Sequence, residues 1–326
     1  MMNNFSLKTT FCRGFGTLFF SAFVVASPIP VKAATLVNSW EPIFKGIDYA
    51  TGFTDDPVPQ SVNSLRIDLF NPNIEFFSTP GNGELPEETI AQTTSQFLDE
   101  YDLQVAVNAN FFAPCCEAAS EPKNLINLAI SNGKIVSPSD SLISENIGEV
   151  PDSILITEDN QAEITSTNPG DNFSNIFTAV SAGPRLLVDG GIVIDEIPRD
   201  AFYDLNPRTA VGLSEDERYL ILMTIDGRQP GVSEGATLFQ TAEWLLRFDA
   251  FQGLNLDGGG STTMVREDQF GDPLLLNIPS TTGGVERFNG NNLGVFARSI
   301  PEPSTLGLIF CSFIGLALSR SKKNID

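Results

Sequence analysis

Residues 255–263 read Asn255-Leu256-Asp257-Gly258-Gly259-Gly260-Ser261-Thr262-Thr263, which sets one carboxylate against three consecutive glycines and three hydroxyls. Glycine lacks Cβ, so such a run lets the backbone adopt unusual dihedral angles and turn its N–H groups toward a ligand. The run also suits a tight turn, because residues 254–256 before it and 264–265 after it are typical of strand ends. A bare turn rarely needs three glycines, yet glycine-rich loops give many false matches, so both interpretations stay open.

Stretches that alternate apolar and polar residues dominate the chain around this loop. Such alternation, with many β-branched and aromatic residues, is typical of strands. The expected strands cover Ser64 to Phe70, Ile74 to Ser78, Val105 to Phe112, Leu128 to Val136, Ile154 to Ile164, Arg185 to Ile194 and Tyr219 to Thr224.

Two segments have helical patterns. Pro86 suits the first turn of one helix, whose apolar face would carry Ile90, Phe97, Leu98 and Tyr101. Thr237 and Gln240 form a capping box for the other, whose apolar side would carry Leu238, Ala242 and Leu245. Many strands with few helices predict an α+β fold, in one mixed domain over residues 34–300 that is large enough to bury a core.

The first 33 residues have the pattern of a secretory signal peptide. Lys8 and Arg13 precede an apolar stretch, residues 15–26, and Val31-Lys32-Ala33 has the small residues of a signal-peptidase site. We therefore expect residues 1–33 to direct export across the cytoplasmic membrane.

Residues 301–326 have a different targeting pattern. Pro301-Glu302-Pro303 leads into an apolar run at 306–318, which a basic cluster follows. This run is shorter than the roughly 17–25 residues of an ordinary spanning helix, and one interpretation is a short anchor. The order of these features resembles the bacterial PEP-CTERM sorting signal. That resemblance implies an exosortase partner, a short transmembrane segment before processing, and a final place at the membrane, on the cell surface or outside the cell.

Charge excludes one large class of partners. The whole chain has a formal net charge of −22, and its ends hold six basic but only two acidic residues, so the body 34–300 stands at −26. Neutralising a phosphate backbone needs clustered lysine and arginine. We therefore expect no nucleic-acid partner.

Histidine and cysteine usage narrows the chemistry. The chain contains no histidine, which removes Ser-His-Asp catalysis, histidine zinc sites and an imidazole base. Within 34–300 the cysteines are the adjacent pair Cys115-Cys116, which would form a vicinal bridge or remain two small buried thiols. Carboxylates must then perform any acid–base step, and we expect neither a cofactor nor a metal.

Polar residues interrupt the apolar strands at two places. Asn108 and Asn110 would lie on one face of their strand, where they either satisfy backbone groups in the core, the commoner role, or bind a polyhydroxylated ligand. Arg208 begins a strand of small residues and forms either a surface ion pair or a bidentate clamp on phosphate or carboxylate. Asp226 follows an apolar strand, where a turn would favour Asp-Gly in any case.

Several motifs together resemble the phosphodiester glycosidase family, over roughly residues 60–300. The motifs occur in the order of that family, and the ordered set is far more specific than any one member. They are Asn108-Ala109-Asn110-Phe111-Phe112, Pro207-Arg208-Thr209-Ala210-Val211-Gly212, Asp226-Gly227-Arg228, the helix from Thr237 to Leu246 with Glu243, Asn255 to Ser261, and Asn291-Asn292-Leu293-Gly294-Val295.

The resemblance implies hydrolysis of the sugar C1–O bond of a sugar-1-phosphodiester or a surface glycan. Carboxylates stabilise the oxocarbenium-like transition state of such a reaction, so Asp257 and Asp226 are the first catalytic candidates and Glu243 is the third. We expect substrate binding by Arg208, Asn108, Asn110, Asn255, Gly258, Gly259, Gly260, Ser261 and Thr262.

Two other functions fit parts of the pattern. A non-catalytic exported protein that binds glycans or Ca²⁺ in an extracellular matrix would suit the acidic body, because Ca²⁺ takes carboxylate oxygens, although no Asp-x-Asp-x-Asp-Gly loop occurs. A serine hydrolase acting through Ser261 would need a base that the sequence does not show.

Overall fold

Antiparallel β-sheets make up most of the regular secondary structure of this protein. The structure is a computed structural model that describes residues 35–115, 120–139 and 152–300. These residues belong to one compact unit, residues 33–326. Four sheets and two α-helices occur in the described ranges. The predicted α+β class is therefore wrong, and the described chain is mainly β. The helices are too short to form a layer of their own, and each covers part of one sheet.

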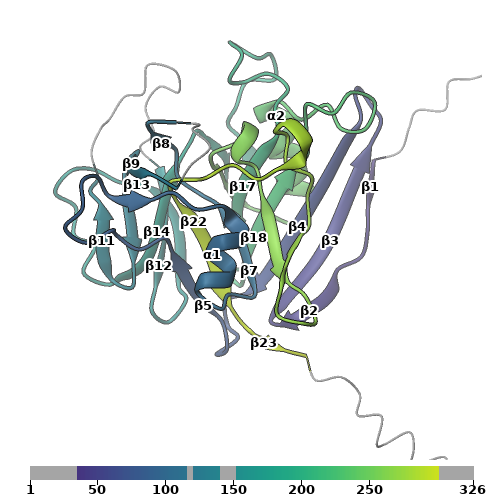
Figure 1. The fold of residues 1–326 in the computed structure, drawn as a ribbon. Helices are drawn as coiled ribbons and strands as arrows, with labels where there is room; N and C mark the ends of the chain where they lie inside the picture. The colour runs from purple at the N-terminus through teal and green to yellow at the C-terminus, as the bar shows by residue number, and fades with distance from the viewer. Residues whose placement is uncertain (1–34, 116–119, 140–151, 301–326) are drawn as a thin grey trace, which may run out of the picture. The chain divides into compact units, whose positions relative to one another are not determined.

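The largest sheet has ten strands (Figure 1). Its order is β16-β15-β19-β17-β18-β4-β3-β2-β23, and β1 pairs with β3. The strands are β1 (Leu36–Val37), β2 (Glu41–Lys45), β3 (Ile47–Thr54), β4 (Gln60–Asp68), β15 (Arg185–Val188), β16 (Gly191–Ile192), β17 (Arg208–Leu213), β18 (Tyr219–Ile225), β19 (Gln252–Asn255) and β23 (Arg298–Ser299).

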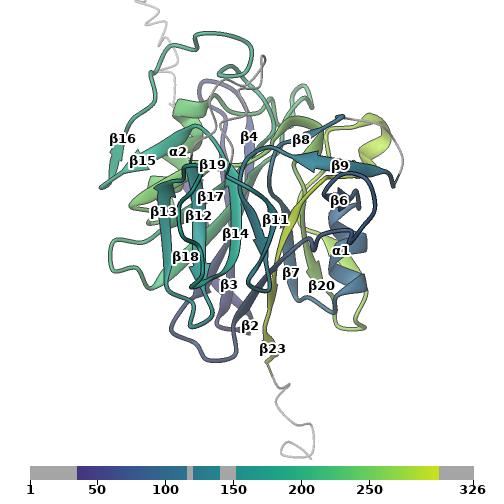
Figure 2. The same cartoon turned by 90° about the vertical axis from the view of Figure 1, so that its left-hand side faces the viewer.

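Three smaller sheets complete the β structure. One has the order β11-β10-β14-β12-β13, another β21-β20-β7-β22-β5 and the third β6-β9-β8; Figure 2 shows the first of these from the side where β12 and β14 lie together. Their strands are β5 (Glu75–Ser78), β6 (Thr89–Ile90), β7 (Val105–Asn108), β8 (Phe112–Ala113), β9 (Pro122–Leu125), β10 (Ala129–Ser131), β11 (Lys134–Ser137), β12 (Asp152–Thr157), β13 (Ala162–Ser166), β14 (Ile176–Ala182), β20 (Met264–Glu267), β21 (Pro273–Leu275) and β22 (Asn292–Phe296).

Several expected strands prove to be hairpins. The stretches at 128–136, 154–164 and 185–194 each divide into two antiparallel strands. Residues at the turns have left-handed backbone angles, as at Asn132 and Asn160, a conformation that asparagine tolerates better than most residues. Apolar alternation continues on both sides of such a turn, so the pattern alone does not mark the break.

The two helices are short and begin with the same cap. α1 (Thr94–Glu100) and α2 (Leu238–Arg247) each follow a threonine in a capping box with a glutamine. The capping box of Thr237 with Gln240 confirms the predicted start of α2. The predicted start of α1 at Pro86 is wrong, because Thr89 and Ile90 form β6 and pair with β9.

The ten-stranded sheet buries both of its faces, because side chains alternate along a strand. On β18, Leu220 and Leu222 belong to a core that includes Val107 and Leu293 from the smaller sheets. The opposite face of β18 packs against α2 through residues such as Met223. α1 covers the outer face of the sheet that contains β7, where Phe97 and Leu98 are buried beside Phe77 and Val265. This layered packing holds the ends of β17, β18 and β19 in place.

The two expected targeting segments lie at the ends of the chain. Within the described ranges, neither helix is long and apolar enough to cross a membrane. The expected signal peptide and the Pro-Glu-Pro segment with its apolar run lie outside those ranges.

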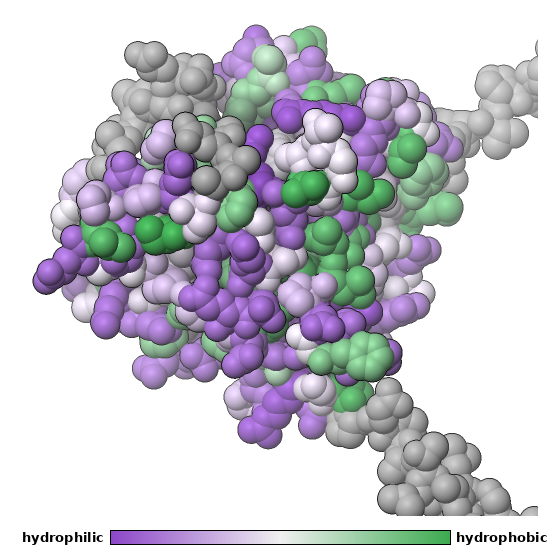
Figure 3. Space-filling view, in the orientation of Figure 1, coloured by the Kyte–Doolittle hydropathy of each residue, from purple (hydrophilic) through white to green (hydrophobic). Residues whose placement is uncertain are grey.

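The described surface is mainly hydrophilic on the face in Figure 3, with separate hydrophobic patches. Cys115 is disulfide-bonded.

Candidate active site

Antiparallel pairing brings the distant sequence motifs to one end of the large sheet. β17 pairs antiparallel with both β18 and β19. The first residue of β17, Arg208, therefore lies at the same end of the sheet as the segments that follow β18 and β19. Those segments begin at Asp226 and Leu256. Residues separated by some fifty positions in the chain thus surround one point.

A cavity of about 400 Å³ opens at this end of the sheet. Its lining includes one carboxylate, that of Asp257, and the guanidinium groups of Arg208, Arg228 and Arg287. The remaining lining residues are Phe111, Ala201, Phe202, Asn206, Gly258, Gly259 and Gly260. A cavity with convergent charged groups and one titratable acid is a candidate active site.

Asp257 lies where the cavity meets the interior. Its side chain keeps part of its surface exposed, but burial raises its pKa from 3.8 to about 6. A hydrogen bond from Ser261, the charge of Arg287 and the backbone of Gly258 act in the opposite direction. The effect of burial on the pKa is the largest, because the charged form loses more favourable hydration energy than these contacts supply. Asp257 is therefore ionised at neutral pH, yet it can accept a proton with little cost.

Asn108 holds the segment that carries Asp257. Its side-chain amide donates to the carbonyl of Asp257. Its oxygen accepts from the hydroxyl of Thr209 at 2.7 Å and from the backbone N–H of Thr263 at 3.1 Å. Asn108 is fully buried and does not line the cavity. It positions the loop instead of contacting a ligand in the cavity.

Each of the three glycines is required for a different reason. A Cβ on Gly258 would lie 2.8 Å from the carbonyl oxygen of Pro207, a backbone atom that cannot move cheaply. Gly259 has φ of +63°, in the left-handed region that side chains disfavour. A Cβ on Gly260 would collide with the guanidinium of Arg287. The loop (η1, Gly259–Ser261) therefore lets two arginines approach it closely, because Arg228 also lies against Gly259.

Arg208 is built into the cavity wall. Its Nε donates to the carbonyl of Ala236 at 2.9 Å, and its Nη2 donates to the carbonyls of Phe202 and Asp204. Burial lowers its pKa to about 9, and the nearby charge of Arg228 adds to the effect. Since Nε and Nη2 are already engaged, Nη1 is the donor that Arg208 can offer to a ligand.

Arg228 and Arg287 were not among the residues expected from the sequence. Arg228 donates to the side-chain oxygen of Asn206 at 2.9 Å, and Arg287 donates to the hydroxyl of Ser261 at 3.3 Å. Burial, and then the charge of Arg287, lower the pKa of Arg228. The scarcity of basic residues could have pointed to Arg228 and Arg287 in the sequence, because each of them stands near glycines in a strongly acidic body.

Three of the expected binding residues are buried away from the cavity. Asn110 donates to the carbonyls of Ile126 and Leu128, and its oxygen accepts from Ser181 N–H and from Asn291. The amide of Asn255 donates to the carbonyl of Gly183. Thr262 is almost fully buried, and among the described residues its hydroxyl has no hydrogen-bond partner. Asn110 and Asn255 serve the backbone, which is the commoner role of a buried amide.

Two of the three expected catalytic carboxylates lie outside the cavity lining. Asp226 is buried and accepts from Asn277 at 3.2 Å and from the backbone N–H of Ile278 at 3.1 Å. Burial raises its pKa to about 6. Glu243 lies on the outer side of α2, half-exposed, 3.9 Å from Arg247 one helical turn away. The structure thus brings Asp257, the glycines and Arg208 together, with Ser261 behind them.

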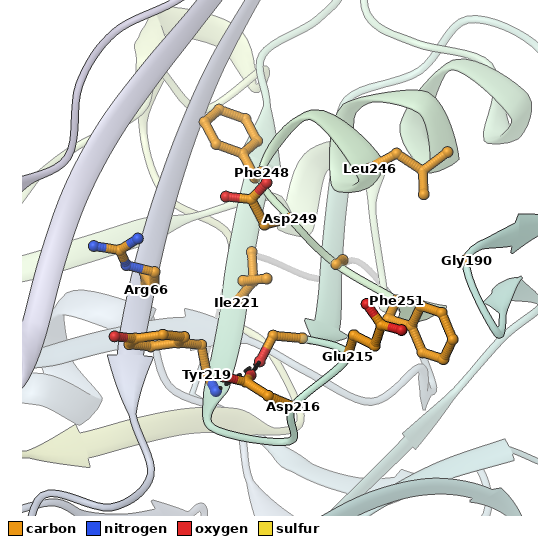
Figure 4. Close-up of a pocket in the computed structure, with 12 residues that line it drawn as sticks. Arg66, Gly190, Glu215, Asp216, Tyr219, Ile221, Leu246, Phe248, Asp249 and Phe251 are labelled. Atoms are coloured by element: carbon orange, nitrogen blue, oxygen red, sulfur yellow. Dashed lines mark hydrogen bonds between the residues drawn. The ribbon is translucent and has the colours of Figure 1, made fainter.

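A second cavity, of about 600 Å³, lies at the other end of β17 and β18 (Figure 4). The guanidinium groups of Arg66 and Arg218 already lie over the ring of Tyr219, 4.8 and 5.1 Å from its centroid, and Phe248 is fully buried. The carboxylates of Glu215 and Asp249 lie apart in Figure 4 and do not converge on one point. We therefore place the candidate site at the first cavity.

Comparison with known proteins identifies the family of this chain. The family model described as phosphodiester glycosidase matches residues 101–296. This chain belongs to the phosphodiester glycosidase family. The matched range includes Asp257 and all three arginines of the cavity.

Individual relatives of this chain are distant. The bovine N-acetylglucosamine-1-phosphodiester alpha-N-acetylglucosaminidase is 29% identical over 176 residues, which cover 49% of this chain and 31% of that protein. The zebrafish catalytic domain of the same name, auto-inhibited by its pro-peptide, has a TM-score of 0.57 and 21% identity, over 82% of this chain and 89% of that chain. A hypothetical protein from Synechocystis has a TM-score of 0.54 and 16% identity, over 83% and 69%. These two structures show a shared fold.

Metal-binding residues do not cluster in the described part of this chain. In residues 35–115, 120–139 and 152–300, no group of three or more histidine, cysteine, aspartate and glutamate side chains could hold a metal ion.

The raised pKa of Asp257 predicts a pH-dependent effect on stability. Below pH 3.8 the carboxyl is protonated in both the folded and the unfolded chain. As pH rises from 3.8 to about 6, the free energy of unfolding falls, because the unfolded chain releases this proton more readily than the folded protein does. Asp257→Asn removes that loss, so the variant should gain stability over the wild type between pH 3.5 and pH 7.5. The upper limit of the gain is about 3 kcal/mol.

Urea denaturation of both proteins across this pH range measures the gain. Glu243→Gln serves as the control for removal of a half-exposed carboxylate. A stability difference between Asp257→Asn and wild type that stays constant with pH would contradict the burial of this group.

Proposed function

We propose that this protein hydrolyses the C1–O bond of a sugar-1-phosphodiester. The observation that supports the proposal most is the pairing of one carboxylate, Asp257, with three arginines in a single cavity. Family membership and the names of the bovine and zebrafish relatives support it further. The chain spans about a third of the bovine protein, so the sugar that the bovine name specifies is only a first candidate here.

The arginines suit the leaving group of this reaction. A phosphodiester carries one negative charge, and breaking its bond to C1 releases a phosphate monoester, whose second pKa is about 6. Negative charge therefore grows on the phosphate during the reaction. Arg228 and Arg287, with Nη1 of Arg208, supply donors around the space beside the glycines. Interactions that strengthen as charge develops accelerate the reaction, and a strong general acid is not needed.

Asp257 suits the attack on C1. Among the described residues it is the one carboxylate that lines the cavity, so a paired-carboxylate mechanism has no second partner there. We assign it as the base. A water molecule attacks C1 and gives a proton to Asp257, while the C1–O bond breaks and its electron pair goes to the phosphate oxygen. The products are the free sugar and the phosphate monoester.

The rival functions find less support at this site. Ser261 is fully buried and engaged with Asp257 and Arg287, which leaves its hydroxyl poorly placed for nucleophilic attack. A cavity with three arginines and one carboxylate favours an anion over Ca²⁺. A non-catalytic glycan-binding protein remains the alternative outcome of the assays below.

We also propose that the enzyme acts outside the cytoplasmic membrane. The proposal rests on the sequence patterns of residues 1–33 and 301–326 alone. Processing by an exosortase would follow from the second pattern.

The first assay compares two carboxylate variants of the full chain. Asp257→Asn should lower kcat/KM by about 10²–10⁴, the range for loss of an acid–base group, whereas Glu243→Gln should retain activity because its side chain lies outside the cavity. Chromogenic α-linked 1-phosphodiesters of N-acetylglucosamine, glucose and galactose, with and without chelator, provide the measurement. No turnover of any donor by the wild type would favour the binding-protein alternative.

The second assay tests the arginines that surround the phosphate. Arg287→Met should lower kcat/KM by roughly 10- to 150-fold, the equivalent of a charged hydrogen bond of about 1.5–3 kcal/mol, and weaken inhibition by inorganic phosphate in parallel. Arg228→Met should behave similarly. Arg247→Met is the matched control, since Arg247 pairs with Glu243 on α2. Normal kinetics and normal phosphate inhibition in both cavity variants would refute the assigned role.

A further inference from the structure

The candidate active-site cavity carries more positive charge than a phosphodiester can neutralise. Its charged lining consists of the guanidinium groups of Arg208, Arg228 and Arg287 and the carboxylate of Asp257. At neutral pH three positive charges and one negative charge leave +2. A phosphodiester brings one negative charge, so one positive charge stays unmatched when it binds.

The three arginines are not neutralised from outside the cavity. Within the described ranges of the chain, none of them forms a salt bridge with a carboxylate. Their hydrogen bonds go instead to neutral carbonyl, amide and hydroxyl oxygens. The charge of Asp204 offsets part of the effect of burial on the pKa of Arg208, but the carboxylate of Asp204 does not line the cavity.

The guanidinium groups also repel one another. Arg228 and Arg287 pack against consecutive residues of the loop, Gly259 and Gly260. Burial and then the charge of Arg287 lower the pKa of Arg228, and burial and then the charge of Arg228 lower the pKa of Arg208. Like charges held together in a partly dehydrated cavity cost free energy, and a bound anion relieves that cost in proportion to its own charge.

We propose that this cavity binds phosphate dianions in preference to monoanions, and that the phosphate monoester released by the proposed reaction therefore inhibits the protein. The preference follows from the charges of the cavity alone, whereas the inhibition rests on the proposed function. A phosphate monoester has a second pKa of about 6 and is mainly a dianion at pH 8. A phosphodiester has no second ionisation, so the product matches the charge of the cavity better than the substrate does.

Methyl phosphate and methyl sulfate test the preference, because they have nearly the same shape but different charges at pH 8. Calorimetry on the full chain should show that methyl phosphate binds at least about tenfold more tightly than methyl sulfate at pH 8. At pH 5 both ligands carry mainly one negative charge, and the ratio of their affinities should fall to about two or less. Both ligands meet the same protonation state of Asp257, so the ratio removes the effect of its titration.

Two variants change the charge of the cavity in opposite directions. Arg228→Met removes one positive charge and should lower the ratio at pH 8 to about threefold, whereas Asp257→Asn removes the carboxylate and should raise the ratio above that of the wild type. Damage to the fold would lower the ratio in both variants. Arg247→Met changes an arginine on α2 outside the cavity and should keep the wild-type ratio.

The results separate the preference from the proposed function. A ratio of ten that falls at pH 5 and in Arg228→Met supports the preference even if no sugar phosphodiester is hydrolysed, and that combination would refute the proposed function alone. Equal affinities at pH 8, an unchanged ratio at pH 5, or a lower ratio in Asp257→Asn would overturn the preference. If a sugar phosphodiester is hydrolysed, equal inhibition of turnover by the two ligands at pH 8 would overturn the proposed inhibition by product.

Discussion

The site depends on one buried amide, that of Asn108. Asn108 ends a strand of a smaller sheet, accepts from Thr209 in the ten-stranded sheet, and donates to the carbonyl of Asp257. Leaving a buried donor or acceptor without a partner costs about 1–3 kcal/mol, so the two sheets and the loop are constrained together. The backbone of Asp257 is fixed further by its N–H, which donates to the carbonyl of Ala109 at 2.9 Å. The carboxylate therefore projects from a rigid frame.

The charge distribution would attract the proposed anionic substrate only at short range, inside the cavity. The chain carries a net charge of −22, which repels an anionic substrate at a distance, but ions screen such fields over about 8 Å at physiological salt. Inside the cavity the balance reverses, because Arg208, Arg228 and Arg287 face a single carboxylate. Small glycines make that concentration possible, since a side chain at Gly260 would displace Arg287. The proposed binding of an anion at this site therefore depends on local packing.

Local features of the fold were predictable from the sequence, and long-range ones were not. The cap of α2 involves residues three positions apart, so Thr237 and Gln240 revealed it. The predicted start of α1 was wrong because the pairing of β6 with β9 overrides the local pattern. The α+β prediction failed for a related reason, since hairpin turns divide apolar stretches into more strands than periodicity indicates.

The same distinction applies to the site. Asp257 and its glycines form one continuous segment and were found directly, whereas Arg228 and Arg287 reach it only through strand pairing and loop packing. Asn110 and Asn255 are a different case, because a strand pattern does not distinguish an amide that serves the backbone from one that binds a ligand. Contacts from distant segments decide that question.

The central claim is that Asp257 and the three arginines act on the two sides of one C1–O bond. A crystal of the Asp257→Asn protein soaked with an α-linked N-acetylglucosamine 1-phosphate would test it most directly. The account predicts phosphate oxygens within hydrogen-bond distance of Arg228 and Arg287, with C1 of the sugar on the side of residue 257. A phosphate bound elsewhere, or a sugar that lies among the arginines with its phosphate directed to solvent, would contradict it.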